Sequence, residues 1–112
     1  MKSYTDIEQS KKLAEILPIE SADMHYERAY FEGKQSDWFI ALGRPIKSDD
    51  IIPCWSLAAL LNVLPDYTLQ TNSDGTVFLV CDSKKPMISD AYNNPVDACY
   101  EMILKLYELK ML

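Results

Sequence analysis

Hydrophobic residues recur with helical spacing near the N-terminus, between Ile7 and Leu17. We expect a helix that begins at a capping box, in which the Thr5 hydroxyl accepts from the N–H of Glu8 and the Glu8 carboxylate accepts from the N–H of Thr5. Pro18 follows the last apolar position and ends the helix, because its ring cannot continue one. The face expected to be buried comprises Ile7, Ser10, Leu13, Ala14 and Leu17.

The last segment carries the clearest helix start in the chain. The Asn94 side chain suits the N-cap, Pro95 fits the first helical position, and Asp97 lies near the positive end of the helix dipole. The apolar stripe that follows comprises Val96, Cys99, Met102, Ile103, Leu106 and Tyr107. These positions predict an amphipathic helix with one face on the core.

A short, almost wholly apolar run precedes Pro65. We expect a helix with Ser56 as N-cap that ends at or just before Leu64, because proline disfavours helical backbone in the residue ahead of it. The helix is apolar nearly all round, so it should be enclosed on most sides. The junction ahead of it, where we expect the tryptophan to fill the core, comprises Pro53, Trp55 and Leu57.

Strand-like segments separate these three helices. Met24–Phe31 and Trp38–Leu42 are rich in aromatic and apolar residues and flank a turn at residues 33–36. This arrangement predicts an antiparallel hairpin, followed by a loop over residues 44–50.

A second hairpin is predicted further along the chain. Its arms are Tyr67–Thr71 and Thr76–Cys81, and Asp74-Gly75 is a dipeptide typical of tight turns. A further strand is expected within residues 87–92, after a loop around Lys84–Pro86.

The order helix, hairpin, helix, hairpin, helix predicts an α+β fold. We expect three helices with two or more antiparallel β-hairpins, and the C-terminal helix packed on the sheet. The 112 residues are 48% hydrophobic and 25% charged, which suffices for one core without disulfides or metals. Residues 1–112 are therefore expected to form a single globular domain.

Charge and hydropathy make several classes of partner improbable for this protein. The net charge is −6, and no run of basic residues is longer than the pairs Lys11-Lys12 and Lys84-Lys85, which disfavours binding to nucleic acid. The N-terminal segment lacks the apolar stretch of a signal peptide, and the longest uncharged run is too short to span a bilayer. We expect a cytoplasmic protein without a membrane partner.

Few residues suggest chemistry. The widely spaced thiols of Cys54, Cys81 and Cys99 form no CxxC motif, and the chain has one histidine, so neither a metal site nor a cofactor is expected. His25 would have to lie beside Cys54 to generate a thiolate nucleophile, which nothing in the spacing requires. The paired carboxylates Asp49 and Asp50 are expected to be solvated or to cap the following segment.

The aromatic residues are the more informative group. Twelve rings are too many for a domain of this size to bury easily, and aromatics are common at binding hot spots. Core packing and a binding face both remain open for them. The candidate interaction surface comprises Tyr26, Tyr30, Phe31, Trp38 and Trp55.

Four segments carry a resemblance to a known family. With "TDIEQSKKL", "SADM", "IPCWSLAALL" and "NPVDACYEMILKL" in this order, the chain resembles a family of small uncharacterised proteins encoded in prophages and mobile elements of gut bacteria. Members that carry a tryptophan before the leucine late in the last helix differ from this chain, which has Lys105 before Leu106. The resemblance implies a biological context but no activity and no site residues.

These observations favour a non-catalytic cytoplasmic accessory protein that binds another protein. One alternative is an acidic mimic of nucleic acid that inhibits a DNA-binding protein, which requires carboxylates along one elongated face. The other is a small enzyme that uses Cys54 with His25. The identity of a partner and the oligomeric state are left open by the sequence.

Overall fold

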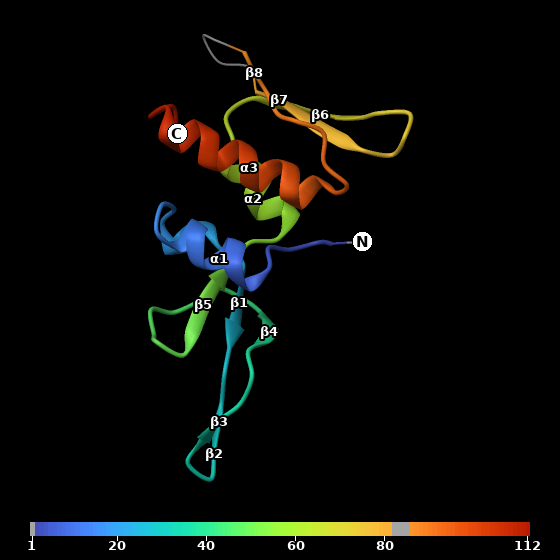
Figure 1. Ribbon diagram of the computed structural model, residues 1–112. Helices are drawn as coiled ribbons and strands as arrows, with labels where there is room; N and C mark the ends of the chain where they lie inside the picture. The colour runs from blue at the N-terminus through green and yellow to red at the C-terminus, as the bar shows by residue number, and fades with distance from the viewer. Residues whose placement is uncertain (1, 82–85) are drawn as a thin grey trace.

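The described residues, 2–81 and 86–112, form an elongated α+β structure in the computed structural model (Figure 1). Its principal extents are 53 × 31 × 19 Å, and its radius of gyration is 15.3 Å. A compact domain of this length would have a radius of gyration of about 13 Å. The difference arises largely from a β-hairpin that projects from one end of the molecule (Figure 1).

Helix α1 (Ile7–Ala14) begins one residue later than its sequence pattern suggested. Asp6 is the N-cap, and its carboxylate accepts from the N–H of Gln9 at 2.8 Å. The Gln9 side chain accepts from the N–H of Asp6 at 3.2 Å, which completes the capping box. The predicted box of Thr5 and Glu8 is therefore wrong, and the Thr5 side chain is buried.

The other two helices begin where the sequence predicted. Helix α2 (Leu57–Val63) is capped by the Ser56 hydroxyl, and helix α3 (Pro95–Glu108) by the Asn94 side chain. Each cap accepts the backbone N–H three residues further on, at 3.2 and 2.9 Å respectively. A short 3₁₀ helix, η1 (Ile19–Ser21), follows α1.

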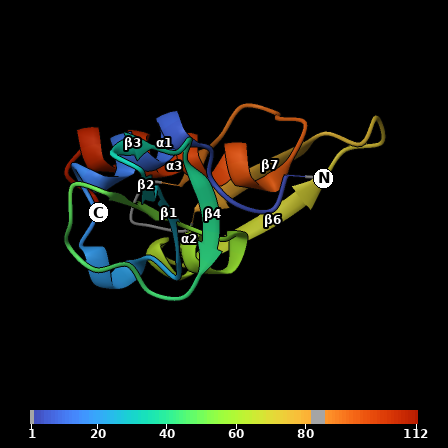
Figure 2. The same ribbon diagram turned by 90° about the horizontal axis from the view of Figure 1, so that it is seen from below.

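The sheet below the helices in Figure 1, here called the lower sheet, has the strand order β4-β1-β5 and is antiparallel throughout. Strand β1 (Met24–Glu27) lies between β4 (Phe39–Leu42) and β5 (Ile51–Cys54). Figure 2, which views the molecule from below, shows β4 on the outer side of β1. The sequence did not predict β5, because it contains Pro53; that proline is tolerated since β5 is an edge strand.

The predicted first hairpin is confirmed, but it is interrupted and its turn is at residues 32–33. The predicted turn at residues 33–36 is wrong, because Lys34–Gln35 form a strand. Beyond β1 and β4 the two chains pair again as β2 (Tyr30–Phe31) and β3 (Lys34–Gln35). The pairing of β1 with β4 ends at Glu27 opposite Phe39, and the pairing of β2 with β3 begins at Tyr30 opposite Gln35. The two pairings are thus three residues apart on the outgoing side of the hairpin and four residues apart on the return side. Residues 28–29 on the outgoing side and 36–38 on the return side lie between the two pairings, and the N–H of Ser36 donates to the carbonyl of Ala29 at 2.8 Å. We call residues 28–38 the arm.

The upper sheet consists of β6 (Tyr67–Thr71), β7 (Val77–Cys81) and β8 (Met87–Ile88). The second predicted hairpin and the further strand are thereby confirmed, with Gly75 at φ 88° in the turn. The loop predicted around Lys84–Pro86 falls mostly on residues 82–85, which lie outside the described residues.

Two clusters of buried hydrophobic residues form the core between the helices and the sheets. The larger lies between α1, α2, α3 and the inner face of β7, so the C-terminal helix packs on a sheet as predicted (Figure 1). The smaller lies on the inner face of the lower sheet, where Tyr4 and Ile7 cover it. Its buried residues are Met24, Tyr26, Ile52 and Cys54.

Candidate interaction surface

The five aromatic residues of the candidate surface do not lie together. Trp55 is fully buried and Tyr26 is 8% exposed, so these two side chains belong to the larger and the smaller cluster rather than to the surface. Trp38 is half-buried at the edge of the smaller cluster. Tyr30 and Phe31 are 58% and 77% exposed, and they alone of the five are open to a partner.

Hydrogen bonds explain why the two buried rings are retained inside. The Tyr26 hydroxyl donates to the backbone carbonyl of Thr5 at 2.8 Å. The Thr5 hydroxyl accepts from the backbone N–H of Trp55 at 3.2 Å, and the indole N–H of Trp55 donates to the Ser21 hydroxyl at 2.9 Å. Each polar end thus has a partner, as buried tyrosine and tryptophan normally require.

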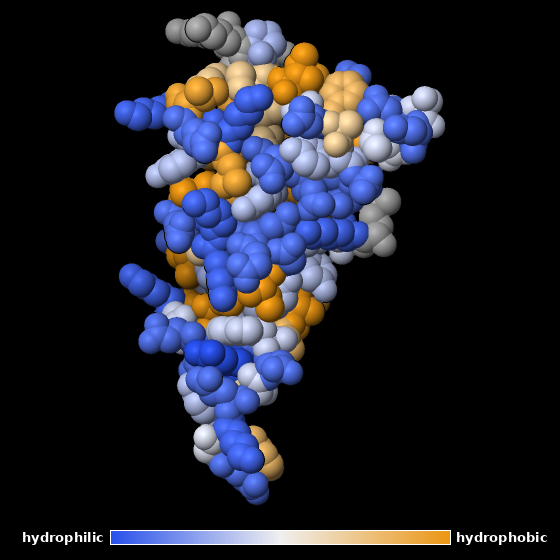
Figure 3. All heavy atoms as spheres, in the orientation of Figure 1, coloured by the Kyte–Doolittle hydropathy of each residue, from blue (hydrophilic) through white to orange (hydrophobic). Residues whose placement is uncertain are grey.

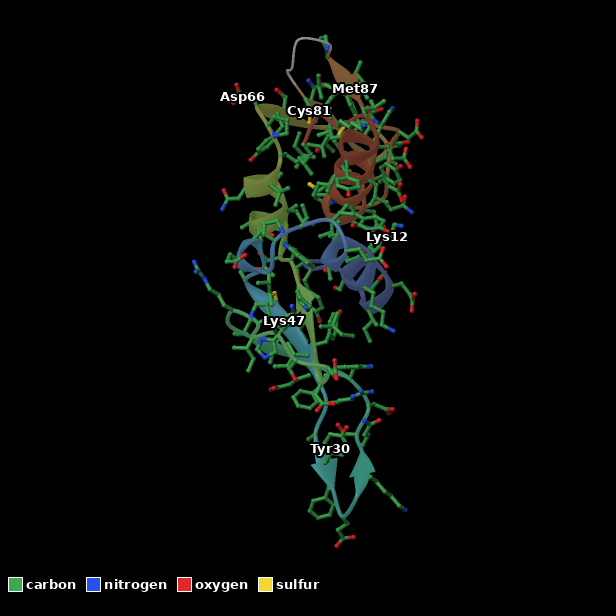
Figure 4. All side chains as sticks on the ribbon, turned by 90° about the vertical axis from the view of Figure 1, so that its left-hand side faces the viewer. Lys12, Tyr30, Lys47, Asp66, Cys81 and Met87 are labelled. Carbon is green, nitrogen blue, oxygen red and sulfur yellow. The ribbon has the colours of Figure 1, made fainter. Side chains whose placement is uncertain are left out.

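Tyr30 and Phe31 form strand β2 near the end of the arm. Figure 4 shows the labelled Tyr30 far from the helices and from the other labelled side chains. The turn that follows uses positive φ at Glu32 (51°) and Gly33 (77°), which matches the twist of a two-residue hairpin. In Figure 3 hydrophobic surface appears at the end of the otherwise hydrophilic arm.

Contacts at the base brace the arm against the lower sheet. The Arg28 guanidinium lies 4.5 Å from the centre of the Trp38 ring, a cation–π contact. Its Nε also donates to the Asp50 carboxylate at 3.0 Å. The Tyr30 hydroxyl donates to the same carboxylate at 3.3 Å and accepts from the Gln35 amide. Asp50, predicted to be a solvated or capping residue, therefore holds the arm in place.

The sequence did not identify three exposed apolar side chains in and after β4. Phe39 is 47% exposed, Leu42 84% and Ile46 69%. The sequence pattern predicted β4 as one arm of a regular hairpin, in which every second side chain would be buried. Phe39 and Leu42 are the two end residues of β4 and lie on opposite faces of the sheet, and Ile46 lies in the loop that follows, so the three do not form one patch.

The structure does not bring the Cys54 thiol and the His25 imidazole together as a catalytic pair. In the sheet, His25 is opposite Pro53 and Met24 is opposite Cys54, so the two side chains point to opposite faces. The His25 Nδ1 bonds instead to the carbonyl of Gly43 at 2.9 Å. Burial raises the pKa of the Cys54 thiol, although hydrogen bonds from Thr5 and Ser10 oppose this effect.

Two hollows of the described surface contain neither the Cys54 thiol nor the His25 imidazole in their lining. One of about 220 Å³ lies beside α3 and is lined partly by Asp90, Glu101 and Lys105. Another of about 300 Å³ lies between α1 and β5 and is mostly apolar. Within residues 2–81 and 86–112, no cluster of histidine, cysteine and carboxylate groups is suited to a metal ion.

The fold and surface define a small α+β protein with a braced, aromatic-tipped hairpin. No protein-family model matches the chain, and searches of curated proteins and of solved structures found no match. None of the helices in the described part of the chain is long and apolar enough to cross a membrane.

Proposed function

We propose that this protein is a non-catalytic cytoplasmic accessory protein of mobile-element origin that binds another protein through the end of its arm. The observation that carries the proposal is the exposure of Phe31, 77%, at the end of a hairpin that projects from the body. Tyr30 beside it is 58% exposed, and its hydroxyl bonds to Asp50 and Gln35.

Aromatic side chains favour this use because they bury a large area when they enter a pocket on a partner. Tyrosine in particular is enriched among the residues that dominate binding energy. The Tyr30 hydroxyl donates to Asp50 and accepts from Gln35, and its second lone pair can accept a hydrogen bond at the rim of such a pocket.

The brace at the base of the arm supports the same function. Binding costs free energy when a loop must first be ordered, and a preformed loop avoids part of that cost. The contacts of Arg28 with Trp38 and Asp50 fix the base before any partner arrives. We expect the partner to offer an apolar pocket of the size of one aromatic ring.

Binding can be tested by placing a photo-crosslinking amino acid at position 31 and recovering the partner from cells of the native host. Phe31→Ser should then abolish binding of the isolated partner, measured by titration calorimetry. Tyr107→Ser is the matched control, because Tyr107 is 48% exposed on α3 and distant from the arm. Equal affinity of Phe31→Ser and the parent protein would contradict the proposal.

A further inference from the structure

The two strands at the end of the arm direct different side chains to its two faces. Tyr30 is opposite Gln35, and Phe31 is opposite Lys34. Because directly opposite residues of an antiparallel pair share a face, the Phe31 and Lys34 side chains leave the arm side by side. Tyr30 and Gln35 lie on the other face, where the Tyr30 hydroxyl bonds to the Asp50 carboxylate. One face of the arm thus offers an exposed apolar ring beside a positive charge.

The positive charge of Lys34 is not neutralised within the chain. Its side chain is exposed, and among residues 2–81 and 86–112 no carboxylate forms an ion pair with it. The nearest carboxylate along the chain, on Glu32, belongs to the turn and makes no such contact. An acidic surface on another molecule can therefore pair with Lys34 without breaking an existing contact.

A hollow in the half of the molecule opposite the arm has the complementary charge (Figure 1). It has a volume of about 220 Å³ and lies between α3 and residues 89–92. Its lining carries three carboxylates and one ammonium group, which gives a net charge of −2. These groups belong to Asp90, Glu101, Glu108 and Lys105.

The Tyr92 hydroxyl at the edge of this hollow responds to the same negative charge. Burial raises the pKa of Tyr92, and the charges of Glu101, Asp90 and Asp97 raise it further. Lys105 forms no ion pair with a carboxylate in the described part of the chain, so it does not neutralise the hollow. A cation that enters the hollow is therefore attracted.

The hollow also has room for one aromatic ring. A cavity of about 150 Å³ can hold benzene, and Leu104 and Tyr92 supply apolar surface to the larger space here. From this match of size and charge, we propose that the end of the arm of one copy docks in the hollow beside α3 of a second copy. Phe31 enters the hollow, and Lys34 meets its carboxylates. The inference rests on the proposed use of the arm as a binding element, and it names a second copy as a partner.

Two other hollows of the described surface fit the arm less well. The hollow between α1 and β5 has Lys47 as its single charged lining residue, which would repel Lys34. The hollow between η1 and α2 carries an arginine beside two carboxylates. One of these carboxylates, on Asp23, already accepts from the N–H and the hydroxyl of Ser56.

The contact joins two different surfaces, so it is head to tail. A copy that gives its arm to a neighbour keeps its own hollow free for the arm of another copy. Such a contact adds further copies unless its rotation closes a ring. Each copy has a net charge of −6, but charges more than about 8 Å apart are largely screened at physiological salt. The charges of the arm and of the hollow therefore dominate the contact.

Mixing two variants tests the head-to-tail contact. The average mass of the parent protein in light scattering should rise with concentration up to about 500 μM. Phe31→Ser lacks the docking ring, and a hollow variant with Glu101→Lys and Glu108→Lys lacks the acidic surface. Each should be a monomer alone, because both changes are at exposed positions but each removes one half of the contact. Mixed in equal amounts, they should form a one-to-one dimer from the intact hollow of the first and the intact arm of the second.

Charge reversal tests the role of Lys34. Lys34→Glu should weaken self-association about tenfold or more, because a carboxylate then meets the acidic hollow. Combined in one chain with the hollow variant, the same change should restore association. Lys47→Glu is the matched control, because it changes the net charge equally at an exposed site outside the arm and the hollow. It should leave self-association unchanged.

Three outcomes would overturn the inference. They are a parent protein that stays monomeric up to the same concentration, a mixture of the two variants that stays monomeric, and a Lys34→Glu variant that associates like Lys47→Glu. The proposed function stands in each case if Phe31→Ser still loses the partner isolated by photo-crosslinking. Conversely, a Phe31→Ser variant that binds that partner like the parent but no longer self-associates would contradict the proposed function alone.

Discussion

The indole N–H of Trp55 donates a hydrogen bond to the Ser21 hydroxyl at 2.9 Å, across 34 residues of sequence. This contact joins the residue ahead of α2 to the end of η1. Trp55 is the largest fully buried side chain described, and its polar atom is satisfied inside the larger cluster. It therefore links segments that come from different parts of the chain.

Truncation of this side chain should destabilise the fold severely. Trp55→Ala should lower the free energy of unfolding by about 3–5 kcal/mol, because it leaves a cavity in the larger cluster. Ser21→Ala, which leaves the indole N–H without its partner, should cost about 1–3 kcal/mol. Urea unfolding followed by circular dichroism measures both. A Trp55→Ala variant as stable as the exposed-site variant Phe31→Ser would refute this assignment of Trp55 to the core.

The three thiols should react slowly in the folded protein. Cys54, Cys81 and Cys99 are all buried, and burial raises the pKa of Cys99 to about 12. Labelling with a thiol reagent at pH 8 should be at least about 100-fold slower than in denaturant, because it requires local opening. Fast labelling of Cys54 alone in the native protein would instead favour a reactive cysteine.

The same thiols make stability depend on pH in the alkaline range. The unfolded thiols ionise above a pH of about 8.5, whereas the folded thiols of Cys54 and Cys99 remain protonated. The unfolded state then binds fewer protons than the folded state, so the free energy of unfolding should fall as pH rises through this range. Urea unfolding between pH 7 and pH 10, with Cys99→Ala as comparison, should show a smaller fall in the variant.

Asp97 should make an acid-sensitive contribution. Burial opposes its charge, but hydrogen bonds from Lys2, Gln9 and Asn94 outweigh that effect and lower the pKa of its carboxyl. Its contribution is therefore complete above the unfolded pKa of about 3.9 and is lost as pH falls through the lower folded value. Asp97→Asn should cost about 1 kcal/mol at pH 7. The difference from the parent should disappear in urea unfolding at low pH; a constant difference would refute the mechanism.

Loss of the Arg28 contacts at the base of the arm should make the arm more mobile without unfolding the rest of the protein. Arg28→Leu removes the contacts with Trp38 and Asp50. The N–H of Ser36, which donates to the carbonyl of Ala29 at 2.8 Å, should then exchange with solvent deuterium about tenfold faster. Arg44→Leu, at an exposed site away from the arm, is the control and should leave that exchange rate unchanged.

The position of the first capping box shows a limit of sequence reasoning. The segment Thr5 to Gln9 contains two overlapping boxes, and both Thr5 and Asp6 are good N-caps. The choice depends on a distant part of the chain, because the Thr5 hydroxyl is used by Ser10 and by the backbone of Trp55. Local pattern cannot reveal such competition.

Strand β5 shows a second limit. Its four residues include a proline, which argues against a central strand but not against an edge strand. The sequence carries no sign of which strand lies at an edge. By contrast, α2, α3 and the hairpin of β6 and β7 have local caps and turns that do not depend on distant contacts, and these predictions are confirmed.

The candidate surface was only partly predictable for a related reason. Composition indicates that some aromatic rings stay in solvent, but not which ones. Tyr26 and Trp38 lie in similar aromatic surroundings in the sequence. Tyr26 lies in the central strand of its sheet and is buried, whereas Trp38 lies between the two strand pairings and is half-buried. Burial of this kind follows from the pairing register and from what covers each face.

The contact of the Lys2 ammonium with the Asp97 carboxylate, at 2.8 Å across 95 residues, has a consequence for synthesis. At about 5–20 residues per second, a ribosome needs roughly 5–20 s to add the residues that separate them. In the later part of that time, after Trp55 has been added, Leu13 and Trp55 lack the face of α3 that completes their cluster. The nascent chain must therefore keep this apolar surface from aggregating until its last helix leaves the ribosome.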